Sequence, residues 1–173
     1  MLRIRKELTS PGNPAVKAFA RLVRSRRRRE EDRLAPAFSH RLLRECLLRP
    51  GLVQEAFVTE RALAEHGLDD ALASASEQQE LGVSLCSEKV MEKLGSEDGT
   101  AFLARLLPPS SHLSPEVAPP VIPSPVRRLL VLDAVRDPGN VGTLIRTAHV
   151  LGWSAVFLLG SCVDAFSSKV MSV

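Results

Sequence analysis

A proline-rich stretch sets the strongest limit on how this chain of 173 residues can fold. Residues 108–125 hold seven of the chain's twelve prolines, together with four serines. Proline can neither donate a hydrogen bond to a sheet nor continue a helix, so we expect residues 108–127 to form a semi-extended linker. The linker should separate an N-terminal domain, residues 1–107, from a C-terminal piece, residues 128–173.

The N-terminal region alternates short apolar runs with helical patterns. The runs predict strands over residues 52–59, 82–86 and 101–107. Periodic apolar residues, caps and breakers predict helices over residues 13–29, 39–48, 60–66, 69–79 and 87–94. This alternation is typical of a small α/β domain.

Arginines crowd the second half of the first expected helix. Seven fall within thirteen residues: Arg21, Arg24, Arg26, Arg27, Arg28, Arg29 and Arg33. One interpretation is a solvated helix face or a disordered basic arm, partly neutralised by the acidic residues 30–32. The other is RNA phosphate contact through Arg24 and Arg26–Arg29. With aromatic residues at 4% and no tyrosine, base stacking is a poor candidate for the main mode of RNA contact.

Other classes of site find little support. The three cysteines are far apart, no Cys-x-x-Cys occurs, and no histidine stands at ligand spacing from a cysteine, so we expect neither a disulfide framework nor a metal site. No apolar stretch reaches 18 residues, so no membrane span is expected. The arginine-rich start weakly resembles an organellar transit peptide. We expect an intracellular protein, with cytoplasm, mitochondrion and chloroplast left open.

The pattern of the C-terminal piece predicts a strand–helix–strand unit. Leu129–Leu132 is a continuous apolar run, which predicts a parallel strand buried on both faces. A turn over Asp133–Asn140 follows, then a helix from about Val141 to Leu151. Ala155–Leu159 predicts a second strand. The two strands and the helix make a βαβ unit.

The expected helix carries one polar position of interest. Val141, Leu144, Ile145, Ala148 and Leu151 share one face, and Arg146 lies nearly opposite. We expect Arg146 one turn from the helix N-terminus, where free N–H groups favour anions. Gly139 and Gly142 would let a ligand approach, although their spacing fits neither a dinucleotide fingerprint nor a P-loop. Arg146 is then either a solvated arginine or part of a site for an RNA phosphate or ribose.

The stretch Leu132–Ala148 resembles motif 1 of the SpoU (TrmH-like) RNA 2′-O-ribose methyltransferases of the SPOUT superfamily. Its core reads Asp-Pro-Gly-Asn-x-Gly-x-x-x-Arg-Thr-Ala. The resemblance implies that Asn140 and Arg146 are active-site residues, with the arginine contacting the target phosphate and helping to deprotonate the ribose hydroxyl. It also implies S-adenosylmethionine as methyl donor, RNA as substrate, ribosomal RNA in preference to transfer RNA, and a homodimer for the full-length family member.

The resemblance extends to the N-terminus. Thr9–Lys17, Arg41–Glu45 and Ser87–Leu94 are similar to parts of the family's RNA-recognition domain, which has a ribosomal-protein-like α/β fold. One departure is clear. The family has a Glu-Gly pair just before the Arg41 position, whereas Phe38-Ser39 stand here, after residues 34–37 where the family has a strand.

Family motifs 2 and 3 are not found in the chain. They supply the trefoil-knot loops that hold S-adenosylmethionine and much of the dimer interface. We therefore expect the first βαβ part of a SPOUT domain with the knot missing, donor-binding residues beyond Val173, and an inactive, C-terminally truncated form. Two alternatives stay open. One is a non-catalytic RNA-binding protein, and the other is an unrelated nucleotide-binding α/β protein that uses the Gly139–Gly142 turn.

Overall fold

The computed structural model describes residues 2–78, 80–106 and 128–171. These residues divide into two compact units. One holds the residues up to Leu106, and the other holds most of the described residues from 128 onward. The expected linker, residues 108–127, lies outside the described residues. The functions assigned to the two domains stay predictions.

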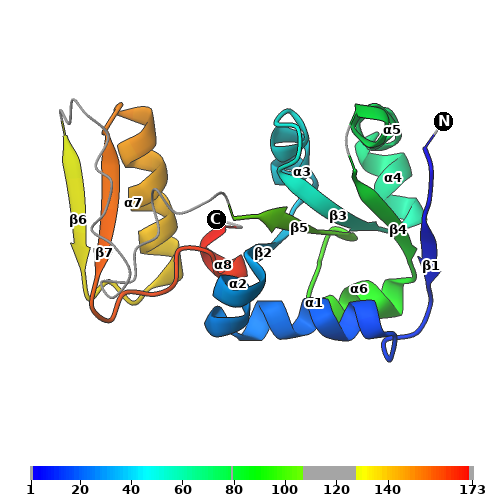
Figure 1. Cartoon of the computed structure of the whole chain (residues 1–173), viewed down its shortest axis with the longest axis horizontal. Helices are drawn as coiled ribbons and strands as arrows, with labels where there is room; N and C mark the ends of the chain where they lie inside the picture. The colour runs from blue at the N-terminus through cyan, green and yellow to red at the C-terminus, as the bar shows by residue number, and fades with distance from the viewer. Residues whose placement is uncertain (1, 79, 107–127, 172–173) are drawn as a thin grey trace. The chain divides into compact units, whose positions relative to one another are not determined.

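The N-terminal unit is built on a five-stranded mixed sheet (Figure 1). Its strands are β1 (Lys6–Leu8), β2 (Leu34–Phe38), β3 (Val53–Val58), β4 (Gly82–Cys86) and β5 (Thr100–Arg105), in the order β1-β4-β3-β5-β2. Strands β1, β4 and β3 run parallel, while β5 is antiparallel to both β3 and β2. The sequence pattern did not predict β1, because only one of its three residues, Leu8, is buried.

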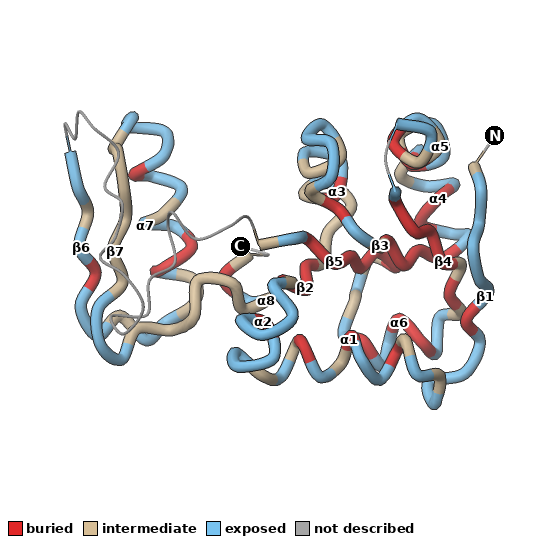
Figure 2. Tube along the Cα trace, viewed as in Figure 1, coloured by how far each residue is buried: buried red, intermediate tan, exposed pale blue. Residues whose placement is uncertain are grey.

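Helices cover both faces of this sheet. They are α1 (Pro14–Arg24), α2 (Arg26–Asp32), α3 (His40–Leu47), α4 (Glu60–His66), α5 (Asp69–Gln78) and α6 (Glu88–Leu94). Figure 1 shows α1 and α6 on one face and α3, α4 and α5 on the other. The buried residues follow the strands and the sheet-facing sides of the helices (Figure 2). In the core, Phe19 packs edge-on against Phe57 and Phe38, with ring centroids 5.2 and 5.7 Å apart.

The single helix expected over residues 13–29 is wrong, because the chain leaves helical geometry at Ser25. This residue has φ −125° and ψ 110°. Its N–H donates to the carbonyl of Arg21 and closes α1, while its hydroxyl accepts from the N–H of Arg28 at 3.3 Å and caps α2. Serine is a favoured N-cap because its side chain satisfies a free N–H of the next helix. At the other end of α1, the side chain of Asn13 caps the helix by accepting from the N–H of Ala15 at 2.9 Å.

Strand β2 forms in spite of the Phe38-Ser39 departure and a proline in its middle. It lies at the edge of the sheet, where a residue without an N–H is tolerated. The turn after it has a feature of its own: Ser39 has φ 109°. That region of backbone geometry favours glycine, which is the residue that the family resemblance has at this position. A non-glycine residue held there costs on the order of 1–3 kcal/mol.

The C-terminal unit contains the expected strand–helix–strand unit. Strand β6 (Leu129–Asp133) pairs parallel with β7 (Ala155–Leu159), α7 (Pro138–Val150) connects them, and α8 (Ser168–Met171) follows. The expectation that β6 is buried on both faces is wrong. Leu132 is 5% exposed, but Leu129 and Val131 are 38% and 48% exposed. The cause is that a two-stranded sheet with α7 on one side has its other side uncovered by described residues.

None of the described helices is both long enough and apolar enough to span a bilayer.

Candidate functional site

Helix α7 begins earlier than the sequence pattern predicted. Its first residue is Pro138 rather than Val141, and Asp137 is the N-cap, with Oδ1 accepting from the N–H of Asn140 at 2.7 Å. Proline suits the first helical position because its missing N–H would be unsatisfied there anyway. Gly139 and Asn140 therefore lie in the first helical turn, not in the preceding loop.

This start moves Arg146 away from the helix N-terminus. Arg146 follows Pro138 by eight residues, which is about 12 Å along the helix axis. The expectation that it lies one turn from the N-terminus is therefore wrong. The N–H of Asn140 is also occupied by Asp137. The face of the helix was predicted correctly only in part: Arg146 is exposed and Val141 and Ala148 are buried. Leu144 and Leu151, which were expected on the same apolar face, are 36% and 55% exposed.

A row of exposed polar residues runs along the outer surface of α7. Asn140, Thr143 and Arg146 recur every three positions and are all exposed. Nη2 of Arg146 donates to Oγ1 of Thr143 at 3.3 Å, so the guanidinium is turned back toward the N-terminal end of the helix. Sequence reasoning did not identify Thr143, although its spacing from both predicted residues was visible. The row offers an amide, a hydroxyl and a guanidinium, which suit a phosphate or a ribose.

The second candidate site is the basic surface on α2, where acidic neighbours take up much of the charge. Nε of Arg26 lies 2.8 Å from Glu30, and Nε of Arg27 lies 2.7 Å from Glu31. Nη1 of Arg28 also reaches Glu31, at 3.1 Å. Hydrogen bonds from Arg27 and then Arg28 lower the pKa of the Glu31 carboxyl. The expected local neutralisation of the arginine cluster is thus confirmed.

Arg29 occupies a different place from its neighbours. It is only 4% exposed, and Nη1 donates to the carbonyl oxygen of Leu22 and, at 3.1 Å, to that of Val23. It therefore satisfies carbonyls near the C-terminus of α1, which lack helical partners. The prediction that Arg29 contacts RNA is not compatible with this burial. Arg24 is exposed, and no side-chain partner is found for it among the described residues.

Comparison with protein families matches residues 127–173 to the SpoU rRNA Methylase family. Over 96% of its length the chain is 28% identical to the 23S rRNA (guanosine(2553)-2′-O)-methyltransferase RlmP of Bacillus subtilis. A shorter match, 51% identical over 43 residues, is to the human protein rRNA methyltransferase 3, mitochondrial. The relatives thus include bacterial and mitochondrial rRNA methyltransferases.

Solved structures agree with the sequence matches. The AdoMet-bound rRNA methyltransferase from Sinorhizobium meliloti superposes with a TM-score of 0.68 at 26% identity, over 95% of this chain. The matched region is 58% of that protein and 59% of the B. subtilis enzyme. The chain therefore spans a little over half the length of these relatives.

Proposed function

Residues 127–173 belong to the SpoU rRNA methylase family, and we propose from that premise that they contribute to the active site of an RNA ribose 2′-O-methyltransferase. The observation that carries the proposal is the exposed row Asn140–Thr143–Arg146 on α7. A surface arginine held by a neighbouring hydroxyl, with an amide in the same exposed row, is suited to bind the phosphate next to the ribose to be modified.

Arg146 would act on the ribose in two ways. Its guanidinium binds the target phosphate and so places the 2′-hydroxyl. Its positive charge also favours loss of the hydroxyl proton, which a neutral alcohol needs because it is a poor nucleophile at neutral pH. The side-chain amide of Asn140, in the first turn of the same helix, can donate and accept hydrogen bonds at the substrate.

S-adenosylmethionine is the proposed methyl donor, since a structural relative is described as AdoMet-bound. Beside α7, the described residues do not form a site that fits it. The apolar hollow beside α7 measures about 130 Å³ and is lined by Leu130, Leu144, Thr147, Ala148, Leu151 and Trp153. Sites for small molecules usually measure roughly 300–1,000 Å³. We therefore assign no donor-binding residue within residues 128–171, and we expect the 173-residue chain to be inactive by itself.

RNA recognition is assigned to exposed arginines. Arg24, Arg26, Arg27 and Arg28 are exposed on α1 and α2, and they are proposed to contact phosphates together with Arg146. We favour ribosomal RNA as substrate over transfer RNA because the B. subtilis and human relatives are named as rRNA methyltransferases. A homodimer, expected for the full-length family member, is part of the same proposal.

A chimera tests the catalytic proposal. The part of the B. subtilis enzyme that this chain does not match would be joined after residue 173, and transfer of radiolabelled methyl groups to rRNA would be measured. We expect transfer by the chimera and none by the 173-residue chain. Arg146→Ala should slow transfer at least about a hundredfold, the lower range for a positioned catalytic group. Arg128→Ala, which removes another exposed arginine of the same unit, should have little effect.

Two results would contradict this function. One is a chimera whose rate is unaffected by Arg146→Ala. The other is a product in which mass spectrometry finds the methyl group on a base rather than on a ribose 2′-oxygen.

A second candidate function is RNA binding without catalysis by this chain. It is favoured because the N-terminal unit, which carries the exposed arginines of α1 and α2, has a buried hydrophobic core of its own. The β6–β7 sheet, in contrast, is covered by described residues on one side only. It predicts that the 173-residue chain binds RNA and that the binding constant falls as salt is added. The dependence of the logarithm of this constant on the logarithm of salt concentration should become less steep when Arg24, Arg27 and Arg28 are replaced by alanine. If the chain has no measurable affinity for RNA at low salt, this second function is contradicted.

A further inference from the structure

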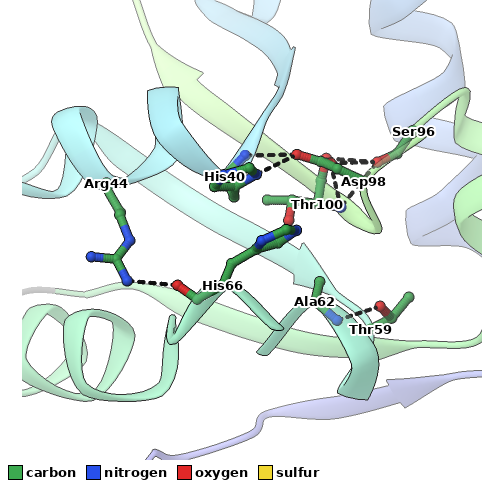
Figure 3. A network of polar contacts seen from close by, with 8 residues as sticks. All are labelled: His40, Arg44, Thr59, Ala62, His66, Ser96, Asp98 and Thr100. Carbon is green, nitrogen blue, oxygen red and sulfur yellow. Dashed lines mark hydrogen bonds and ion pairs between the residues drawn. The ribbon is translucent and has the colours of Figure 1, made fainter. Parts of the chain in front are cut away.

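Three side chains with metal-binding atoms meet in the N-terminal unit, and none of them belongs to either site described above (Figure 3). His40 is the first residue of α3, His66 is the last residue of α4, and Asp98 lies between α6 and β5. One ligand atom from each lies within 4.8 Å of the other two. They are far apart in sequence, which is why spacing rules for metal sites did not find them.

The carboxylate of Asp98 is held in place by its surroundings. Oδ2 accepts from the backbone N–H of His40 at 2.9 Å and lies 3.0 Å from Nδ1 of that residue's ring. Oδ1 accepts from the N–H of Thr100 at 3.0 Å and from the hydroxyl of Ser96 at 3.2 Å. Metal-binding carboxylates and imidazoles are commonly oriented by hydrogen bonds of this kind.

The position of His66 is fixed through its backbone. Nη2 of Arg44 donates to the carbonyl oxygens of His66 and Gly67, at 2.6 and 2.8 Å, and so ties the end of α4 to α3. The ring of His66 stacks on that of His40, with centroids 3.7 Å apart and planes 9° from parallel. The side chains of His40 and Asp98 are 25% and 27% exposed, so the cluster is accessible from solvent.

A neighbouring hydroxyl gives a second, independent sign of a missing ligand. Oγ1 of Thr100 is buried, and no hydrogen-bond partner is found for it among the described residues. Figure 3 shows this hydroxyl directed toward the ring of His66. A buried polar atom without a partner costs about 1–3 kcal/mol, and an ion with its bound water would give it one.

We propose that His40, His66 and Asp98 bind a zinc ion or a closely similar divalent cation. Two imidazoles and one carboxylate are a ligand set that zinc uses, and three protein ligands leave one coordination position open for water. Zinc–ligand bonds of about 2.0–2.2 Å require ligand atoms roughly 3.3 Å apart. The ring of His66 must therefore turn out of the stack, because two parallel rings cannot both direct a nitrogen at one ion.

A competing explanation is that Asp98 only caps α3 and the two rings only pack together. It predicts that substitutions alter stability without any zinc binding. The proposal predicts a defined stoichiometry instead. The 173-residue chain, freed of metal with EDTA and dialysed, would be titrated with zinc by calorimetry in the presence of a competing chelator, and bound zinc would be counted by elemental analysis.

We expect one zinc ion per chain. His40→Gln and His66→Gln should each weaken zinc binding at least about tenfold, a conservative figure since even residues that only support ligands have that effect. His149→Gln is the matched control, because it removes an exposed histidine of the other unit, and it should leave the affinity unchanged. A chain that retains no zinc would overturn the proposal, as would equal affinity in all three variants.

X-ray absorption on the unaltered chain with zinc keeps the proposal testable if a variant does not fold. The spectrum is expected to show two imidazole ligands and only nitrogen or oxygen atoms bound to the zinc. A sulfur ligand would overturn the proposal, since it would place the ion on a cysteine. Burial, followed by the charge of Glu55, raises the pKa of the Cys86 thiol to about 12 and disfavours the thiolate that would bind a metal.

Discussion

Asp98 closes the N-terminus of α3 although it stands 58 residues from His40, accepting the N–H of that residue at 2.9 Å. Ser39, the residue at the N-cap position, makes no side-chain hydrogen bond to the helix. The capping carboxylate thus comes from the loop before β5. This loop, rather than the local sequence, satisfies the first N–H of α3.

Asp98→Asn should destabilise the chain in a pH-dependent way. Burial alone would raise the pKa of Asp98, but hydrogen bonds from His40, Thr100 and Ser96 outweigh it and lower this pKa. The ionised carboxylate therefore contributes stability that is fully present above the ordinary value of about 3.9 and is lost as pH falls through the lowered folded value. The loss should be on the order of 1 kcal/mol at pH 7, because the amide has no charge and keeps only one of the two accepting oxygens, so that a hydrogen bond is lost.

Urea unfolding in zinc-free buffer at pH 7 and near pH 3 checks this expectation. The difference between Asp98→Asn and the unaltered chain should shrink at the lower pH. Glu92→Gln, which neutralises an exposed carboxylate on α6, is the control and should have little effect. A difference that is the same at both pH values would count against the ionised cap.

Arg29→Met should be the most damaging change in the arginine cluster. It leaves the carbonyls of Leu22 and Val23 without their side-chain donor. Hydrogen bonds from charged groups are worth about 1.5–3 kcal/mol, so we expect a loss of roughly 2 kcal/mol or more. Arg28→Met, at an exposed neighbour, should change stability by less than about 0.5 kcal/mol. Equal effects of the two substitutions in chemical unfolding would contradict the assignment.

Ser39→Gly should stabilise the chain. Glycine adopts φ 109° without the steric cost that serine has, but it loses more backbone entropy on folding. Strain relief of about 1–3 kcal/mol against an entropic cost of about 0.5–1 kcal/mol leaves a net gain of up to about 2.5 kcal/mol. Thermal unfolding measures it. Ser87→Gly, where φ is −72°, should give no gain, so a rise for both variants would exclude relief of strain as the cause.

Thr143→Val should reduce methyl transfer less than Arg146→Ala does. The substitution keeps the shape of the side chain and removes the hydroxyl that accepts from Arg146. A hydrogen bond worth about 0.5–1.5 kcal/mol corresponds to a loss of up to about tenfold in the rate of the chimera. Thr147→Val alters another exposed threonine of α7 and serves as control. An unchanged rate for Thr143→Val would show that this hydroxyl does not orient Arg146.

Local sequence signals predicted the elements whose ends are marked by particular residues in the sequence. Helix α4 is bounded by Thr59, which caps it, and by Gly67 in left-handed geometry, and the predicted range was the observed one. Strand β4 was likewise predicted at its observed bounds. Strand β1 was missed because three residues with one buried side chain leave no periodic pattern. The break at Ser25 was missed because the apolar and basic pattern continues through it.

The candidate sites depended on information beyond periodicity. Asn140 and Arg146 were identified through family resemblance, and their roles stay predictions. The burial of Arg29 was hidden within a run of arginines, and only the fold shows which of them turns inward. The cluster of His40, His66 and Asp98 arises from the packing of three separate elements.

The position of Pro36 at the sheet edge also bears on aggregation. An edge strand exposes N–H and C=O groups with which another molecule can pair. Strand β2 has no donor at Pro36, and the opposite edge, β1, is only three residues long with exposed Lys6 and Glu7. Both edges thus resist intermolecular pairing. The exposed leucine and valine of β6 have no such protection, so self-association of this chain should begin there.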